Sequence, residues 1–325
     1  MSAENPTLDL YRPELRFAEK LDLHARRVVE GFISGLHQSP YQGFSVEFAE
    51  HRAYAQGEST RHLDWKLLAR TDKPYVKRYE AETNLRCWMA IDRSRSMRYP
   101  VGPPEEATKG GIKGAEADDQ QKLLFSMRAS AALVHLLKRQ RDAFGLAWLG
   151  QGLESVSEAR LSTRHQRELF EQMGRVWADE EGDARSSNLA EGLNRLAERM
   201  RSRSMLAVFT DLFETGAALD DLTAALQHLR FKKHDVVVFH VLNRSLEMEL
   251  GLDNRPYKLI DAETGRSLQV EPMQIREAYR ERAESFAQDM KLRCGAVGVD
   301  WVEVDTALGY KPVLVEFLRR RAKMF

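Results

Sequence analysis

The stretch AIDRSRSM, residues 90 to 97, places an acid and two hydroxyls at alternate positions, directly after an apolar run that begins near Leu85. A hard divalent cation such as Mg²⁺ takes about six oxygen ligands, accepts water among them, and needs only one or two carboxylates from the protein. Alternate residues of an extended turn point the same way. We therefore expect Asp92, Ser94 and Ser96 to form one half of a metal site, the alternative being a polar loop that leaves a strand.

Two further loops carry oxygen ligands of the same kind. Asp211, in VFTDLFE, ends another apolar run, and Ser187 and Asn188 precede an amphipathic segment. A carboxylate at the end of a buried strand needs compensation, which a hydrated cation would supply. Asp211 could instead accept backbone hydrogen bonds in a turn, and Ser187 or Asn188 could cap a helix. The predicted ligands of the cation, which is Mg²⁺ or alternatively Mn²⁺ or Ca²⁺, are Asp92, Ser94, Ser96, Ser187 and Asp211.

The elements that would hold these loops follow from the spacing of the apolar residues. From Leu85 onward, short apolar strands alternate with amphipathic helices, which is typical of βαβ units and of a mostly parallel sheet covered on both faces. We therefore expect a doubly wound α/β fold of the Rossmann type, with ligands beyond the carboxyl ends of its strands. The predicted strands are 85–92, 144–150, 152–157, 205–211, 235–242 and 297–304, the predicted hairpin is 257–270, and the predicted helices are 120–140, 163–177, 187–200, 218–230, 273–293 and 312–325.

The first 84 residues have a different pattern. A three-and-four spacing of apolar residues predicts a helix over 15–36, and strands are expected at 43–54 and 74–82, with a turn and a short helix between them. We interpret residues 1–84 as an N-terminal helix with a β-rich attachment that packs on a main domain at 85–325. Residues 101–119 are rich in glycine, proline and charge, and are expected to form a long loop.

The overall composition excludes several classes of protein. The chain has 325 residues, of which 43% are hydrophobic and 30% are charged, so it can bury a large core. Its 49 basic and 49 acidic residues balance, so no global field favours nucleic acid or an anionic membrane. No uncharged apolar run approaches the roughly 18 to 20 residues of a membrane-spanning helix. The two cysteines, Cys87 and Cys294, form no paired motif, which favours the reducing cytoplasm.

Enzymatic functions have weaker support in the sequence. There is no G-x-x-x-x-G-K-[ST] phosphate-binding loop and no G-x-S-x-G nucleophile turn. The nearest enzymatic alternative is a Mg²⁺-dependent phosphatase or other hydrolase in which Asp92 is the nucleophile and Asp211 holds the metal. Such haloacid dehalogenase-like enzymes have a second acid two residues after the nucleophile, where this chain has Ser94. We therefore expect a binding protein without catalytic residues.

Two motifs carry a resemblance to known families. Asp92, Ser94 and Ser96, with a hydroxyl at Ser187 and Thr210-Asp211 at a later strand end, resemble the metal-ion-dependent adhesion site of von Willebrand factor A domains. The segment GESTRHLDWKLLAR is similar to the signature of the DUF58 family. Its matching residues are Gly57, Arg61, Asp64, Trp65, Ala69 and Arg70.

This resemblance implies a von Willebrand A-like domain that works as an adaptor or co-chaperone of a MoxR-type AAA+ ATPase and contacts a client protein. The signature residues are either structural, with Trp65 packed and Asp64 paired with an arginine, or part of the partner-binding surface. The sequence also departs from the pattern. Serine stands at 187 where most such domains have threonine, Gly57-Glu58-Ser59 replaces Gly-Asp-Asp, and Arg93 and Arg95 bring positive charge beside the predicted cation.

Overall fold

The structure is a computed structural model that describes residues 13–37, 51–53, 70, 75–77, 85–100, 120–179, 188–201, 203–212, 217–260 and 265–324. The chain divides into two compact units. The larger unit comprises residues 1–30 and 85–325, and the smaller one comprises residues 31–84. In the smaller unit, β1 (His51–Ala53) and β2 (Tyr75–Lys77) pair antiparallel.

The larger unit is built on a six-stranded sheet, as the sequence predicts. The strands lie in the order β10-β7-β6-β3-β4-β5, and every neighbouring pair is parallel except β4 and β5. The strands are β3 (Arg86–Asp92), β4 (Ala143–Leu149), β5 (Leu153–Val156), β6 (Met205–Thr210), β7 (Asp235–Leu242) and β10 (Asp300–Asp305). This arrangement confirms the predicted doubly wound α/β fold.

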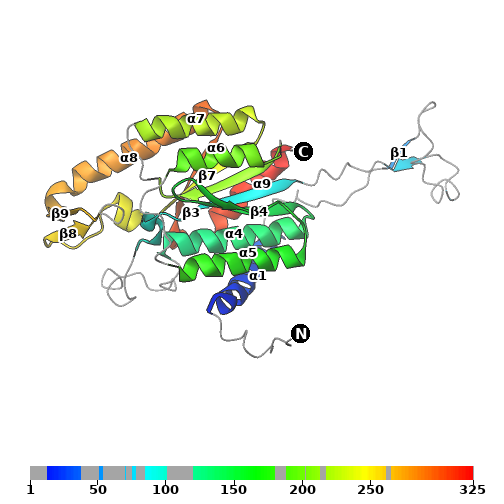
Figure 1. Ribbon diagram of the computed structural model, residues 1–325, viewed down its shortest axis with the longest axis horizontal. Helices are drawn as coiled ribbons and strands as arrows, with labels where there is room; N and C mark the ends of the chain where they lie inside the picture. Colours follow the sequence, from blue (N-terminus) through cyan, green and yellow to red (C-terminus); the bar gives the residue numbers. More distant parts are fainter. Residues whose placement is uncertain are drawn as a thin grey trace, which may run out of the picture. The chain divides into compact units, whose positions relative to one another are not determined.

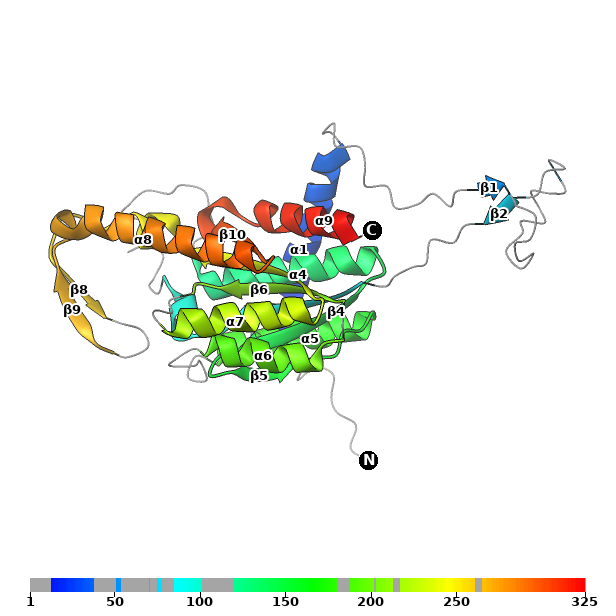
Figure 2. The same cartoon turned by 90° about the horizontal axis from the view of Figure 1, so that it is seen from above.

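Helices cover both faces of this sheet. Figure 1 shows α6, α7 and α8 on one side and α4, α5 and α1 on the other, and α9 packs against α4 (Figure 2). The helices are α1 (Pro13–His37), α4 (Lys122–Arg139), α5 (Thr163–Ala178), α6 (Leu189–Arg199), α7 (Ala217–Phe231), α8 (Pro272–Ala296) and α9 (Lys311–Met324). Each corresponds to a predicted helix, with ends that differ by a few residues.

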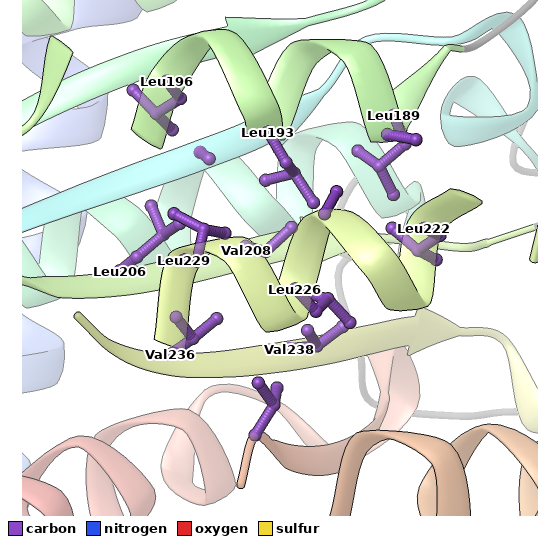
Figure 3. Close-up of a cluster of buried hydrophobic side chains, with 14 of the residues drawn as sticks. Leu189, Leu193, Leu196, Leu206, Val208, Leu222, Leu226, Leu229, Val236 and Val238 are labelled. Carbon is purple, nitrogen blue, oxygen red and sulfur yellow. The ribbon is translucent and has the colours of Figure 1, made fainter. Parts of the chain in front are cut away.

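The core follows from the alternation of side chains along the strands. In the fully buried strand β6, Leu206 and Val208 face α6 and α7 and join the leucines of both helices (Figure 3). On the opposite face, Phe209 stacks on Phe239 of β7 with 5.0 Å between ring centroids. A strand with apolar residues on both faces is stable only between two helical layers. The packing of the core therefore sets the positions of the strand ends and of the loops that follow them.

Shorter elements lie at the carboxyl ends of the strands. A 3₁₀ turn, η3 (Arg95–Arg98), follows β3, and a π-helical turn, η6 (Arg244–Met248), follows β7. Neither was predicted. The predicted hairpin is confirmed by β8 (Tyr257–Ile260) and β9 (Ser267–Val270), and a last 3₁₀ turn, η7 (Thr306–Leu308), follows β10. The predicted loop at 101–119 lies outside the described residues.

The order of the strands distinguishes one position in the sheet, between β3 and β6. From β3 the chain continues outward through β4 and β5, and then returns to the other side of β3 to form β6, β7 and β10. The strand order therefore reverses between β3 and β6, which is where ligands bind in open sheets of this kind. In the part of the chain that is described, no helix combines the length and apolarity needed to cross a bilayer.

Candidate cation site at the carboxyl edge of the sheet

Asp92 ends β3 at the reversal point and is only 2% exposed. One of its carboxylate oxygens, Oδ1, accepts a hydrogen bond from the backbone N–H of Ser94 at 2.9 Å. The other, Oδ2, accepts one from the hydroxyl of Thr210 at 2.9 Å. Because Thr210 is the last residue of β6, this bond joins the carboxyl ends of two adjacent strands and holds the Asp92 side chain in one orientation.

Ser94 and Ser96 converge, although not in the expected manner. We predicted an extended turn, but only Ser94 has an extended backbone, and Ser96 lies in the 3₁₀ turn η3. The backbone N–H of Met97 donates to the carbonyl of Ser94 at 3.0 Å, and this closes the turn. The two hydroxyl oxygens are 3.0 Å apart as a result, so a helical turn and not strand alternation brings them together.

Asp211 directly follows β6 and is 3% exposed. Its Oδ2 accepts a hydrogen bond from the ammonium of Lys122 at 2.7 Å, and its backbone carbonyl accepts one from Nε2 of His240 at 3.0 Å. From the sequence we expected a hydrated cation to compensate this carboxylate. In the structure, Lys122 provides a compensating positive charge.

Lys122 is the first residue of α4, and its side chain is completely buried. Its ammonium contacts Glu247 of η6 as well as Asp211. Glu247 is held in turn, because its Oε2 accepts from the backbone N–H of Asn243 at 2.7 Å and its carbonyl accepts from the hydroxyl of Tyr279 at 2.6 Å. The ammonium thus lies between the carboxylates that follow β6 and β7.

The sequence reasoning missed Lys122 and Glu247. A signal for Lys122 exists, because it opens KLLFSMRASAALV, whose next three residues are apolar and buried. A charged residue on a buried helix face needs a partner of opposite charge. Glu247 has no comparable signal, because it is one of two glutamates in the stretch SLEMEL, and an unpredicted π-helical turn aims it inward.

The titratable groups of the site show an excess of negative charge. Burial, together with the negative charge of Asp211, raises the pKa of Asp92 to about 7. Burial also raises the pKa of Glu247, and Lys122 only partly offsets this. Burial alone would lower the pKa of Lys122, but Asp211 and Glu247 outweigh it and raise that pKa. Among the described residues, the Lys122 ammonium thus contacts two carboxylates, those of Asp211 and Glu247, and the negative charge of Asp211 also acts on Asp92.

Arg93, which the sequence places beside the predicted cation, directs its charge elsewhere. Its guanidinium lies 3.3 Å from a carboxylate oxygen of Glu154 and 3.6 Å from one of Asp179. These acids belong to β5 and to the residue that follows α5. The positive charge of Arg93 is therefore balanced by acids outside the Asp92 site, and this reduces the charge conflict that the sequence suggested.

Comparison with known proteins identifies the family. The family model described as "Protein of unknown function DUF58" matches residues 50–289, which include the signature segment and all the acids of the candidate site. The chain belongs to the DUF58 family.

Relatives that match most of the length of this DUF58 protein occur in mycobacteria. It is 24% identical over 322 residues to the uncharacterized protein Rv1480 of Mycobacterium tuberculosis, and equally so to the uncharacterized protein Mb1516 of Mycobacterium bovis. Each match covers 97% of this chain and 92% of the relative. The similarity thus extends over both units of the chain.

Some predicted residues of the DUF58 protein cannot be placed. Ser187, the predicted fourth ligand, and the signature residues Gly57, Arg61, Asp64 and Trp65 lie outside the described residues, whereas Arg70 is described and exposed. The neighbour of Ser187 behaves as a helix cap. Oδ1 of Asn188 accepts from the backbone N–H of Glu191 at 3.1 Å, so the predicted N-cap of α6 is Asn188.

The side-chain oxygens near Asp92 are of the types that a hard divalent cation accepts. Asp92 would offer a carboxylate, Ser94 and Ser96 two neighbouring hydroxyls, and Asp211 a second carboxylate that Lys122 already engages. Within the described residues, no group of three or more His, Cys, Asp and Glu side chains could hold a metal. Hydroxyl ligands are compatible with that finding, because Mg²⁺ accepts neutral oxygens and retains several waters.

Proposed function

We propose that this DUF58 protein is a metal-dependent protein–protein interaction module. A divalent cation, with Mg²⁺ the best fit to an all-oxygen site, would be held by Asp92, Ser94, Ser96, Ser187 and Asp211. The observation that carries the proposal is the pair of serine hydroxyls 3.0 Å apart, beside a buried carboxylate at the point where strand order reverses. The carboxylate of Asp211 lies near enough for its negative charge to raise the pKa of Asp92.

The ligand types indicate what the ion would do. Two hydroxyls are neutral, and one of the two carboxylates is already engaged by Lys122. A cation that receives so little negative charge from its own protein remains a strong acceptor for an outside carboxylate. The partner would therefore present an aspartate or glutamate that completes the coordination shell, and this chemistry suits recognition of a protein surface.

We further propose that the partner is a MoxR-type AAA+ ATPase, which this protein serves in the cytoplasm as an adaptor or co-chaperone for a client protein. This part rests on the resemblance of the acid and serine motif to adhesion sites and on membership of the DUF58 family. The von Willebrand A-like resemblance supports this proposal, because domains with such a site bind partners through the ion.

The test is capture of a MoxR-type ATPase from the same organism by the full-length chain. Binding should require Mg²⁺, should be lost with EDTA, and should be lost in Asp92→Ala. A matched control is Asp253→Ala, because Asp253 is an exposed aspartate between η6 and the hairpin and is not a proposed ligand. Capture that persists with EDTA and in Asp92→Ala would refute the metal-dependent mechanism. Failure of capture with Mg²⁺ would refute this partner.

The alternative function, a Mg²⁺-dependent hydrolase with Asp92 as nucleophile, has less support. Asp92 is 2% exposed, and both of its oxygens accept hydrogen bonds, from Ser94 and Thr210. No specific observation favours it beyond the position of Asp92 at a strand end. Turnover of a generic phosphate ester that requires Mg²⁺ and disappears in Asp92→Asn would reverse this ranking.

A further inference from the structure

Lys122 is an unusual residue for its position. It lies in the first turn of α4, where Leu123, Leu124 and Phe125 are all buried, and its own side chain has no exposed surface. A buried ammonium is costly unless it is paired, and here it contacts carboxylates from two different strand ends. One of these, Asp211, is a proposed cation ligand, and the cation site and the Lys122 pair therefore share a carboxylate.

We propose that Lys122 sets the affinity of the cation site. Its ammonium competes with the divalent ion for Asp211. When the ion is bound, the negative charge of Glu247 compensates the positive charge of the ammonium. This inference rests on the proposed function, because it assigns a role within the same site. Lys122 accordingly tunes the affinity of the site and is not itself a ligand.

Coulomb's law supplies the physical reason. Where water is excluded, two positive charges a few ångströms apart repel strongly, so an ammonium bound to Asp211 opposes a divalent ion at the same carboxylate. Glu247 is suited to hold the ammonium, because the backbone N–H of Asn243 fixes its second oxygen at 2.7 Å. The ion alone would then bind weakly, because the ammonium offsets the negative charge of Asp211. A carboxylate from the partner would supply negative charge in its place. Ion and partner would bind cooperatively.

A purely structural role for Lys122 predicts the opposite result. If the lysine only braces α4 against the ends of β6 and β7, its loss loosens the ligand loops and weakens ion binding. If it competes with the ion, its loss strengthens ion binding. The sign of the change in affinity therefore distinguishes the two roles.

The decisive experiment is calorimetric titration of the full-length chain with Mn²⁺ or Mg²⁺ alone. We expect Lys122→Met, which keeps the length of the side chain and removes its charge, to bind at least about tenfold more tightly than the wild type. Lys232→Met is the matched control, because Lys232 pairs with Glu198 on the surface, and its affinity should be unchanged. Equal or weaker binding by folded Lys122→Met overturns the inference.

Glu247→Gln keeps the proposal testable if Lys122→Met does not fold. This variant retains the shape of the side chain but removes its negative charge, so that Asp211 becomes the charged partner that the ammonium keeps. We expect ion affinity to fall several-fold. Unchanged or tighter binding by Glu247→Gln overturns the inference, whatever the outcome for Lys122→Met.

These results separate this inference from the proposed function. If the wild type captures its partner with Mg²⁺ but Lys122→Met binds the ion no more tightly, the function holds and the role of Lys122 is wrong. If the wild type binds no ion but Lys122→Met does, the role of Lys122 holds, and the ammonium replaces the metal in the native protein. If neither binds, both proposals fail.

Discussion

Two networks of partly buried charges lie at opposite ends of the same sheet, and they differ in their balance. At the amino ends of β7 and β10, Arg320 contacts Asp235 and Asp300, and also lies 3.3 Å from Glu316. Arg319 and Arg230 pair with the same acids. We call this the amino-edge network; its members are Arg230, Arg319, Arg320, Asp235, Asp300 and Glu316. The carboxyl-edge network consists of Lys122, Asp92, Asp211 and Glu247.

Counted over the described residues, the amino-edge network has three arginines for three acids, whereas the carboxyl-edge network has one lysine for three acids. The effect on pKa follows this difference. Burial raises the pKa of Asp300, but Arg320 and Arg319 outweigh it and hold that pKa below its usual value, whereas the pKa of Asp92 is raised to about 7. A strongly perturbed pKa marks Asp92 as a candidate functional residue, and under the proposed function an external cation would supply the positive charge that the carboxyl-edge network lacks.

The largest expected effect is the loss of stability in Lys122→Met without metal. Removing the ammonium leaves two buried carboxylates without their shared counter-charge, so the free energy of unfolding should fall by about 3 to 5 kcal/mol in EDTA. Lys232→Met, which breaks a surface pair, should cost no more than about 1 kcal/mol. Denaturant unfolding measures both. Similar losses in the two variants would show that the charge of Lys122 is not energetically coupled to the acids.

Arg320→Met tests the other end of the sheet. Arg320 is 6% exposed, but Asp300 is more than a third exposed, so we expect a loss at the low end of that range, about 3 kcal/mol. Millimolar Mg²⁺ should not alter this loss, whereas it should restore part of the stability of Lys122→Met through binding. Rescue of both variants by Mg²⁺ would remove the distinction between the two networks.

The raised pKa of Asp92 predicts a pH dependence in EDTA. The ordinary value for this group is 3.8, and its value in the folded state is about 7. The folded state therefore binds the proton more tightly, and stability rises as pH falls from 7 towards 4 and is lost again as pH rises through 7. Between pH 7.5 and 5.0, the wild type should gain about 2 to 3 kcal/mol relative to Asp92→Asn, which cannot titrate. Unfolding in urea at the two pH values measures this difference.

Mg²⁺ sharpens the same test. An ion needs the ionised carboxylate, so saturating Mg²⁺ should expel the proton from Asp92 and abolish the pH-dependent difference above pH 6. A difference that persists unchanged in Mg²⁺ would place the ion elsewhere.

Much of the fold could be predicted because its signals are local. Apolar runs such as that of β6 and amphipathic segments such as α6 show their type within about ten residues, and their alternation indicates a parallel sheet. The turns η3 and η6 were missed, because they are too short to show a hydrophobic period. The direction of Glu247 in η6 also involves a contact with a distant residue, Lys122 of α4.

The site was predictable only in part for the same reason. Asp92, Ser94, Ser96 and Asp211 stand at strand ends that the hydrophobic pattern identifies, so their proximity could be inferred from topology. The pairing of Lys122 with Asp211 spans 89 residues, and no local pattern indicates which buried carboxylate a buried lysine meets.

The smallest expected effect is on Mg²⁺ affinity, and it tests the pair of serine hydroxyls that lies at the carboxyl edge of the sheet. Ser96→Ala removes one hydroxyl of the pair, and the loss of one neutral ligand should weaken Mg²⁺ binding about tenfold, equivalent to about 1.4 kcal/mol. Ser157→Ala is the control. It also removes a hydroxyl, one that accepts from the backbone N–H of Leu146 at 2.8 Å, and it should leave ion affinity unchanged. If Ser96→Ala binds Mg²⁺ as tightly as the wild type, the Ser96 hydroxyl is not a ligand of the ion.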